Sequence, residues 1–252
     1  MEKLVLITGG HGFIATNLLK LYPDADILDK PDDICAALPD KPYTHIFHLA
    51  AKHHIPTCER EAEECIRVNC WGTVNLIKKY PNARIIVAGS SSANEIKSVY
   101  GASKAFLETI ATLHKNYLCV KFYNVFGEHQ KLDGGAVTPK LIYHMLTKKP
   151  LEIFGDGTQF RDFTYVGDVV ENLKLLMDSD QRGVTHLGHG EPIMLNQYIE
   201  LIYGEMPMDI TYLPRPEHDI LWSKAPKPCQ RFYGREHGMQ RTIEWFKKEY
   251  GL

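Results

Sequence analysis

Short apolar runs alternate with amphipathic segments along the first half of the sequence. The runs have the length and composition of buried parallel strands, and we expect strands at residues 4–8, 25–28, 45–49, 83–88 and 118–122. Segments of helical periodicity connect them, after Ala15 through Leu21 and at 32–38, 59–80 and 100–116. Strands that alternate with helices in this way predict an α/β fold with a doubly wound parallel sheet.

The second half of the sequence predicts a smaller lobe interleaved with the sheet. Helices are expected within 135–149 and at 166–177, 195–203 and 238–250, and short strands at 151–154, 184–187 and 210–213. Four prolines between residues 214 and 228 indicate an irregular segment. We expect a sheet domain at 1–125, with later segments near 155–190 interleaved, and a mainly separate lobe at 126–252.

Composition narrows the classes of partner. The 252 residues are 44% hydrophobic and 24% charged, with a net charge of −2, which predicts no nucleic-acid or membrane-surface partner. A small phosphorylated ligand stays compatible with the local basic residues. The sequence predicts a strand directly after M-E-K, no signal peptide, and no apolar run near the ~18 residues of a membrane span.

The six cysteines show neither C-x-x-C pairing nor zinc-like spacing with histidine. Several of them lie in apolar or helical stretches. This usage predicts reduced, mostly buried thiols, a cytoplasmic protein and no metal site.

A glycine-rich turn follows the first predicted strand and opens the first helix. Gly9, Gly12 and Ala15 have the spacing G-x-x-G-x-x-A, which in this position favours binding of a dinucleotide pyrophosphate. Asp29 lies at the end of the second strand, about 20 residues further on, where an acid binds ribose hydroxyls. A turn aspartate at a strand end explains Asp29 equally well.

Tyr100 and Lys104 are candidates for acid–base chemistry. A four-residue step places both on one face of a helix. We expect the ammonium group to lower the pKa of the phenol, which a base at neutral pH requires. Taken alone, Y-x-x-x-K is more often the start of an ordinary amphipathic helix.

The motifs together resemble the extended short-chain dehydrogenase/reductase family, in its NAD-dependent nucleotide-sugar epimerase/dehydratase branch. The resemblance implies a Rossmann-type sheet and weakens after Gly183. The matching motifs, in the family's order, are T-G-G-H-G-F-I-A from Thr8, H-L-A-A from His48, V-N-C-W-G-T-V-N-L from Val68, the serines before Tyr100, F-Y-N-V-F-G from Phe122, and G-D-G-T-Q-F-R-D-F-T-Y-V-G-D-V-V from Gly155.

The resemblance implies a role for each matching residue. Tyr100 is the expected catalytic base, Lys104 its partner at the nicotinamide ribose, and Ser92, or Ser91, the hydrogen-bond partner of the sugar 4-hydroxyl. Asn69 braces the active-site loop. Cofactor contacts are expected from Gly9, Gly12, Phe13, Ile14, Asp29, Leu49, Ala50, Ala51, Tyr100 and Lys104, and substrate contacts from Asn124, Arg161 and Arg215.

Two simpler interpretations stand beside those roles. Arg161 also fits a surface ion pair with Asp156 or Asp162. His53 and His54 follow the H-L-A-A turn, and we expect structural roles for both.

The implied activity is NAD-dependent 4-epimerisation of a nucleotide-diphosphate sugar, in carbohydrate biosynthesis. Dehydratases of the family carry charged residues where this chain has Ser92 and Ala93, with only Glu95 nearby. A 4,6-dehydratase, an NADPH-dependent 4-keto-sugar reductase and a cofactor-binding regulatory protein are the alternatives. In the reductase alignment, Asp26 and Ile27 contact adenine and Lys30 meets the 2′-phosphate of NADP. Relatives also predict a homodimer through helices 59–80 and 100–116.

Overall fold

The computed structural model describes residues 3–217 and 219–252, which form two compact units. The first contains the described residues up to Phe122 together with Val170–His186. The second contains Tyr123–Val169 and Leu187–Leu252. The segment that returns to the first unit is thus shorter than the 155–190 expected from the sequence.

A six-stranded sheet forms the centre of the first unit, in the order β10-β5-β4-β3-β1-β2. The neighbours from β2 to β5 pair in parallel, which confirms the predicted α/β fold. Nearly every residue of β1, β4 and β5 is buried or half-buried, as expected of strands covered on both faces. The strands are β1 (Val5–Thr8), β2 (Asp26–Leu28), β3 (His45–His48), β4 (Arg84–Ser90), β5 (Tyr117–Phe122) and β10 (Gly183–Leu187).

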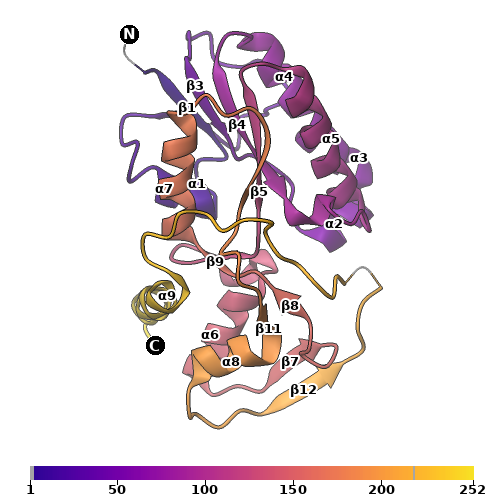
Figure 1. Ribbon diagram of the computed structural model, residues 1–252, viewed down its shortest axis with the longest axis vertical. Helices are drawn as coiled ribbons and strands as arrows, with labels where there is room; N and C mark the ends of the chain where they lie inside the picture. The colour runs from indigo at the N-terminus through magenta and orange to yellow at the C-terminus, as the bar shows by residue number, and fades with distance from the viewer. Residues whose placement is uncertain (1–2, 218) are drawn as a thin grey trace. The chain divides into compact units, whose positions relative to one another are not determined.

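Helices cover both faces of this sheet. Figure 1 shows α3, α4 and α5 along one face and α1 and α7 along the other. The core between β4, β5 and α5 includes Val87, Leu107 and Cys119. The helices are α1 (Phe13–Leu18), α2 (Ile55–Arg60), α3 (Ala62–Ile66), α4 (Gly72–Lys79), α5 (Val99–Leu113) and α7 (Val166–Met177).

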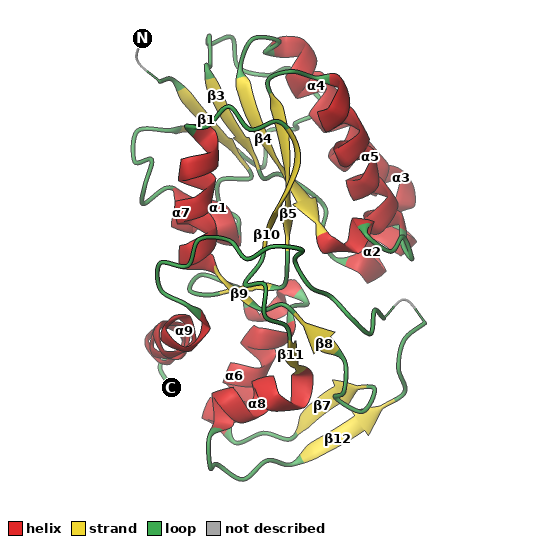
Figure 2. Ribbon diagram, in the orientation of Figure 1, coloured by secondary structure: helices red, strands yellow, loops and turns green. Residues whose placement is uncertain are grey.

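The second unit combines helices with two-stranded pairs (Figure 2). Its helices are α6 (Val137–Thr147), α8 (Leu195–Tyr203) and α9 (Arg235–Tyr250). The ring of Phe163 stacks on that of Tyr198 with centroids 3.6 Å apart, in the middle of its core. The pairs are β6 (Val125–Phe126) with β9 (Thr164–Tyr165), β7 (Leu151–Phe154) with β12 (Ile210–Leu213), and β8 (Phe160–Arg161) with β11 (Ile193–Met194).

The helix predicted at 32–38 is wrong, and side-chain hydrogen bonds explain why. The Asp33 carboxylate accepts a hydrogen bond from the backbone N–H of Cys35. The Asn75 amide donates to the carbonyl oxygens of Ile34 and Ala36, each at 2.9 Å. These bonds satisfy backbone groups that a helix would otherwise pair, so the segment forms turns.

The single helix predicted at 59–80 is interrupted twice. Glu61 leaves helical geometry (φ −120°, ψ 51°) and separates α2 from α3. A π-helix at Arg67–Trp71 then joins α3 to α4. A π-turn inserts an extra residue and changes which side chain faces inward. Asn69, in this turn, is 1% exposed.

Within 3–217 and 219–252, no helix combines the length and the apolar composition needed to cross a membrane.

Candidate active site

Tyr100 and Lys104 lie in the first turns of α5, whose start is fixed by two side chains. The Ser98 hydroxyl accepts a hydrogen bond from the N–H of Gly101 at 3.0 Å. The Glu59 carboxylate, from α2, accepts one from the N–H of Val99 at 2.6 Å. Both bonds satisfy N–H groups that have no partner inside the helix. The backbone that carries Tyr100 is therefore held in place at its amino end.

Lys104 is 3% exposed and points at the strand beside it. Its Nζ donates to the carbonyl oxygen of Ala88 in β4 at 2.7 Å and lies 5.7 Å from the centroid of the Tyr100 ring. Burial disfavours the charged ammonium and lowers the pKa of Lys104 to about 8. The cation is thus close to the phenol but hydrogen-bonded to the backbone.

The pKa of Tyr100 differs from the sequence-based expectation. Burial raises it to about 12, while a side-chain hydrogen bond with Ser90 acts in the opposite direction. The expectation of a lowered pKa was wrong because it counted the nearby ammonium and not the loss of solvent around the phenol. In this state the phenol of Tyr100 is protonated at neutral pH.

Ser90 is the site residue that the sequence reasoning missed. Strand β4 runs two residues beyond its predicted end, and Ser90 pairs with Phe122 of β5. Ser91 and Ser92 follow in a short 3₁₀ turn, Ser91–Ala93. The N–H of Ser92 donates to the Ser90 hydroxyl at 3.2 Å. The available signal was position, because side chains at the carboxyl end of a parallel strand face the ligand crevice.

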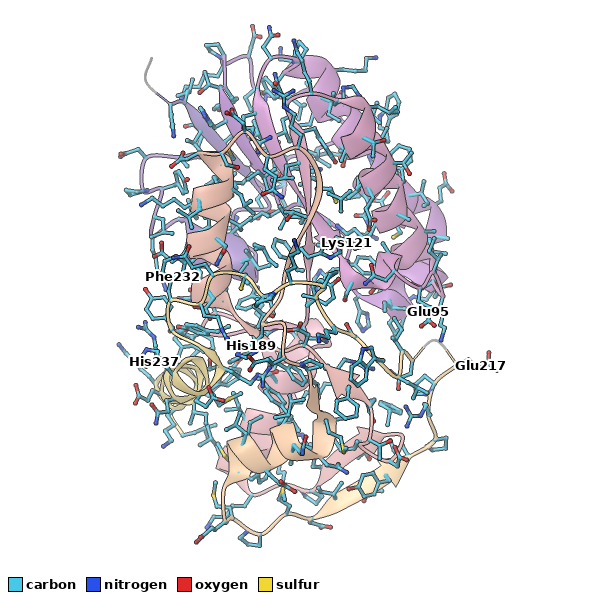
Figure 3. The ribbon with its side chains drawn as sticks, viewed as in Figure 1. Glu95, Lys121, His189, Glu217, Phe232 and His237 are labelled. Carbon is cyan, nitrogen blue, oxygen red and sulfur yellow. The ribbon has the colours of Figure 1, made fainter. Side chains whose placement is uncertain are left out.

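Glu95, the acidic residue nearest the serines in sequence, is directed to solvent. It is exposed and forms an ion pair with Lys97 at 3.3 Å (Figure 3). This position provides no buried carboxylate beside the serine turn.

The glycine turn after β1 requires a residue without a side chain. Gly9 has φ +70°, and a Cβ there would lie 2.8 Å from the backbone of Ala50. The N–H of Gly12 bonds to the carbonyl oxygen of Gly9 at 2.9 Å, and Phe13 and Ile14 then begin α1. The backbone at 9–14 and the turn Leu49–Ala50–Ala51 are therefore adjacent. Side-chain-free backbone at this place fits the close approach that a dinucleotide pyrophosphate needs.

A buried hydrogen-bond chain centred on His48 supports that turn. The N–H of Ala50 donates to the Thr8 hydroxyl at 3.2 Å, and that hydroxyl contacts His48 Nδ1 at 2.7 Å. His48 Nε2 contacts the Thr73 hydroxyl at 2.9 Å, and Thr73 donates to the carbonyl oxygen of Asn69.

The proton positions in this chain follow from the donors. The Thr73 hydroxyl donates its only hydrogen to the carbonyl oxygen of Asn69 and can therefore only accept from His48. His48 Nε2 thus carries the ring hydrogen, and Nδ1 accepts a hydrogen bond from the Thr8 hydroxyl. Burial lowers the pKa of His48 to about 3, which keeps the ring neutral.

Asn69 connects the loop after β3 to α5. Its amide pairs with both backbone groups of Lys52, at 2.8 and 2.9 Å. Its Nδ2 also donates to the Ser103 hydroxyl at 3.0 Å, and Ser103 donates to the carbonyl oxygen of Tyr100. The π-helix places Asn69 where it braces both segments.

Asp29 closes the glycine turn from the end of β2. Its Oδ2 accepts from the N–H of His11 at 2.7 Å, and its Oδ1 accepts from the N–H of Lys30 at 2.8 Å. The imidazole of His11 lies 3.2 Å from the same Oδ2. In the alternative alignment Asp26 would contact adenine, but its carboxylate is engaged by Lys41 and Tyr43.

Arg161 and Arg215 come together in the second unit, on the two sides of Asp219. Arg161 Nη2 lies 2.5 Å from Asp219 Oδ1, and Arg215 Nη1 lies 3.2 Å from Oδ2. Arg215 also pairs with Asp156 at 2.8 Å. The acidic partner of Arg161 is thus Asp219 rather than Asp156 or Asp162.

Asp162 and Asn124 have backbone roles in the same unit. The Asp162 carboxylate accepts from the N–H groups of His189, Gly190 and Ala225. Asn124 has a positive φ of 29°, and its carbonyl oxygen accepts from the N–H of Thr164 at 3.3 Å.

The structure therefore gathers the expected residues in two groups. The Tyr100–Lys104 pair, the serines, the glycine turn, Asp29 and residues 49–51 belong to the first unit, and Asn124, Arg161 and Arg215 to the second. His54 is exposed and bonded to Thr57 at 2.8 Å, as expected of a structural histidine. Among the described residues, no group of three or more His, Cys, Asp or Glu side chains is placed to hold a metal ion.

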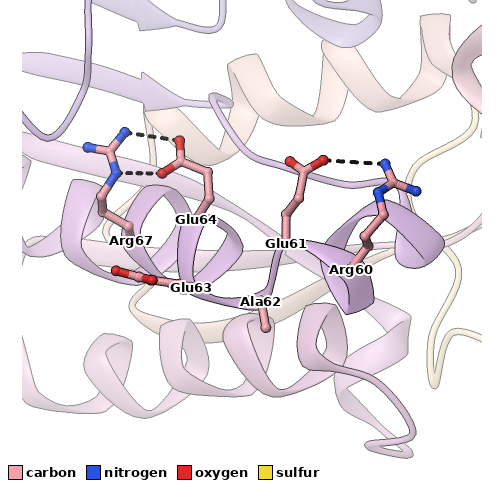
Figure 4. A pocket seen from close by; sticks show the side chains of 6 residues that line it. All are labelled: Arg60, Glu61, Ala62, Glu63, Glu64 and Arg67. Atoms are coloured by element: carbon pink, nitrogen blue, oxygen red, sulfur yellow. Dashed lines mark hydrogen bonds and ion pairs between the residues drawn. The ribbon is translucent and has the colours of Figure 1, made fainter.

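A hollow over α2, α3 and the π-helix is lined almost entirely by arginine and glutamate side chains, unlike the residues around Tyr100 (Figure 4). Its charges pair with one another, Arg60 with Glu61 at 3.3 Å and Arg67 with Glu64 at 2.6 Å. Such exposed pairs are worth little energetically, and the carboxylate of Glu63 gives the hollow an excess of negative charge. The residues lining it are Arg60, Glu61, Ala62, Glu63, Glu64 and Arg67.

Comparison with known proteins identifies the family of the chain. Residues 22–188 match the model of a family described as the NAD dependent epimerase/dehydratase family. The chain is similar to a UDP-glucuronate 4-epimerase of Thermodesulfobacterium geofontis, with 27% identity over 82% of this chain and 73% of the relative. It is equally similar to a UDP-N-acetyl-alpha-D-glucosaminuronate decarboxylase of Bacillus cytotoxicus, with 26% identity over 98% and 99%.

Among solved structures, the chain resembles a UDP-N-acetylglucosamine 4-epimerase from Methanobrevibacter ruminantium in complex with UDP-N-acetylmuramic acid. The TM-score is 0.88 at 25% identity, over 98% of this chain and 99% of the other. The names of these three proteins all contain UDP-sugars, but they describe different reactions.

Proposed function

Because the chain belongs to the NAD dependent epimerase/dehydratase family, we propose that it is a nucleotide-sugar 4-epimerase acting by transient oxidation of sugar C4. The observation that carries the proposal is the serine turn in front of Tyr100. Ser90 lowers the pKa of Tyr100, and Ala93 ends the turn with no acidic or basic side chain. Dehydration needs an added acid and base to expel a hydroxyl group, whereas 4-epimerisation needs only the proton transfer that Tyr100 provides.

The cofactor would be held by the first unit. The backbone around Gly9 and Gly12 would accept the pyrophosphate, residues 49–51 would flank it, and Lys104 would bind the nicotinamide ribose. The Asp29 carboxylate at the ribose favours NAD over NADP, because it repels a 2′-phosphate. Bound NAD would supply the oxidation and reduction at the sugar ring.

The residues of the chain would move and hold one proton. Tyr100, as phenolate, accepts the proton of the sugar 4-hydroxyl and returns it after the sugar has turned over. Burial raises the pKa of Tyr100 to about 12 even with the opposing effect of Ser90, so formation of the phenolate depends on the charges around Tyr100 when NAD and the sugar are bound. The Lys104 ammonium, held at 5.7 Å by Ala88, further favours the phenolate when the proton is accepted. Ser91 and Ser92 would line the sugar side of the turn.

The second unit would bind the nucleotide diphosphate. Arg161 and Arg215 offer planar guanidinium groups suited to phosphate oxygens, and Asn124 would contribute a polar side chain. By resemblance, we also propose a cytoplasmic homodimer joined through α5 and the helical segment from α2 to α4. Exposed Trp71, Phe106 and Leu113 lie on these helices or on the π-helix and would contribute apolar surface.

The proposal is tested by product analysis with a panel of UDP-sugars. The purified protein is denatured to identify its bound dinucleotide, and the holoprotein is incubated with UDP-glucose, UDP-N-acetylglucosamine and UDP-glucuronate. An epimerase yields a C4 epimer of unchanged mass and consumes no NAD. A product lighter by water or carbon dioxide, or stoichiometric oxidation of NADPH with a 4-keto sugar, would replace the proposal by dehydratase, decarboxylase or reductase activity.

A further inference from the structure

Asp219 lies between Arg161 and Arg215 and pairs with both guanidinium groups. Its two carboxylate oxygens are divided between them, Oδ1 to Arg161 and Oδ2 to Arg215. The side chains of Arg161 and Asp219 are 16% and 17% exposed, so this pair is mostly shielded from solvent. Such shielding strengthens a charge pair and makes its separation costly.

Backbone hydrogen bonds hold Asp219 in this position. The segment that follows it is tied to β8 by the N–H of Phe160 to the carbonyl oxygen of Leu221 at 2.9 Å, and by the N–H of Ser223 to Phe160 at 3.2 Å. The rings of Phe160 and Trp222 also contact, with centroids 4.7 Å apart. The N–H of Asp219 closes a turn to Pro216 at 3.0 Å. The carboxylate is therefore part of a built arrangement rather than a mobile surface group.

The charges of the cluster are balanced without a ligand. Two guanidinium groups face two carboxylates, those of Asp219 and Asp156. Asp156 is 66% exposed, so solvent screens its contribution. Asp219 is accordingly the group that decides how strongly an anion is attracted to the two arginines.

We propose that Asp219 is a specificity residue that makes these arginines select diphosphates over monophosphates. The inference rests on the proposed function, in which Arg161 and Arg215 bind the diphosphate of a nucleotide sugar. A single phosphate group that enters between the arginines must displace Asp219 from both of them. One anion then replaces another, so little binding free energy is gained. A diphosphate offers one phosphate group to each guanidinium and compensates for both lost contacts.

The test compares ligands that differ in phosphate number. Isothermal titration at low ionic strength, where ion pairs are least screened, measures UDP and UMP binding to the wild-type protein and to Asp219→Asn. The matched control is Glu217→Gln, which removes one negative charge from an exposed position in the same segment (Figure 3).

We expect wild type to bind UDP about 100-fold more tightly than UMP. Asp219→Asn should strengthen UMP binding about tenfold and UDP binding less, so the ratio falls from about 100-fold toward about tenfold. Glu217→Gln should leave the ratio unchanged, and Asp219→Glu, which keeps the charge, should retain most of the discrimination. Thermal unfolding of each variant verifies that it is folded.

Two results would overturn the proposal in distinguishable ways. An unchanged UDP-to-UMP ratio in folded Asp219→Asn, or equal weakening of both ligands, makes Asp219 a structural partner of the arginines and leaves the 4-epimerase proposal intact. Failure of wild type to bind UDP, inorganic pyrophosphate or any UDP-sugar rejects the diphosphate site itself, and the specificity role with it.

Discussion

The side chain of Ser90 acts on the phenol of Tyr100 and lowers its pKa, although one residue ends a strand and the other begins a helix. This interaction favours the ionised phenol and opposes the effect of burial on its pKa. Ser90→Ala should therefore raise the pKa of Tyr100 further, and the acidic limb of the pH profile of kcat/KM should move to higher pH. We expect kcat to fall about 10- to 100-fold.

Ser92→Ala is the matched control for this prediction. Ser92 contacts Ser90 through its backbone N–H, which the substitution keeps. Its pH profile should stay close to that of wild type. If the acidic limb shifts in Ser92→Ala and does not shift in Ser90→Ala, then Ser92 in the 3₁₀ turn, and not Ser90, lowers the pKa of Tyr100.

Tyr100→Phe should lower kcat by about 10²- to 10⁴-fold, because it removes the group that transfers the proton. The ring and its packing stay, so bound NAD content and the melting temperature should remain near those of wild type. Tyr143→Phe, which removes a hydroxyl bonded to exposed Lys149, serves as control. Turnover by Tyr100→Phe at the wild-type rate would exclude Tyr100 as the base.

His48 predicts a specific acid sensitivity of the fold. Its pKa is about 3 in the folded chain and near 6.5 when unfolded, so between these values the unfolded chain binds more protons. The free energy of unfolding should therefore fall with decreasing pH below 6.5, by about 1.4 kcal/mol per pH unit from this residue.

His48→Gln should remove that contribution, and urea titrations between pH 6.5 and 4.5 measure it. The variant should be less stable at pH 7, because Thr8 and Thr73 lose their shared partner, but its stability should decline less steeply. His114→Gln removes an exposed imidazole and should keep the wild-type slope. Equal slopes for wild type and His48→Gln would show that His48 is not the buried neutral group described.

Gly9→Ala should destabilise the fold by about 1–3 kcal/mol and weaken NAD binding. The substitution places a Cβ at φ +70° and 2.8 Å from the backbone of Ala50. At Gly134 an added Cβ meets no atom within 4 Å, so Gly134→Ala should change stability by about 0.5 kcal/mol or less. Wild-type NAD affinity in Gly9→Ala would separate this turn from cofactor binding.

The sequence was informative where local pattern decides the structure. Apolar runs located the strands of the sheet, and periodicity gave the bounds of α7 and α8. It failed where distant residues compete for backbone groups. Asn75 takes the carbonyl oxygens that a helix at 32–38 would need, and no local feature of that segment reveals this.

The candidate site was predictable by residue type and less so by environment. The positions of Tyr100, Lys104 and Gly9 followed from motif spacing. The Ser90 contact depended on how far β4 extends, and the pKa of Tyr100 on the burial of its phenol. Asp219 lies beside Arg161 because the segment after Asp219 pairs with β8. No pattern in the sequence indicates this tertiary contact.

The most direct test of the central claim is the fate of a deuterium label at sugar C4. UDP-glucose or UDP-N-acetylglucosamine, labelled at C4, is incubated with the purified holoprotein, and the product is examined by mass spectrometry and NMR. The account predicts inverted configuration at C4, retained deuterium and no net change in bound NAD. A product with the original C4 configuration that has lost water, or loss of the label to solvent, would contradict it.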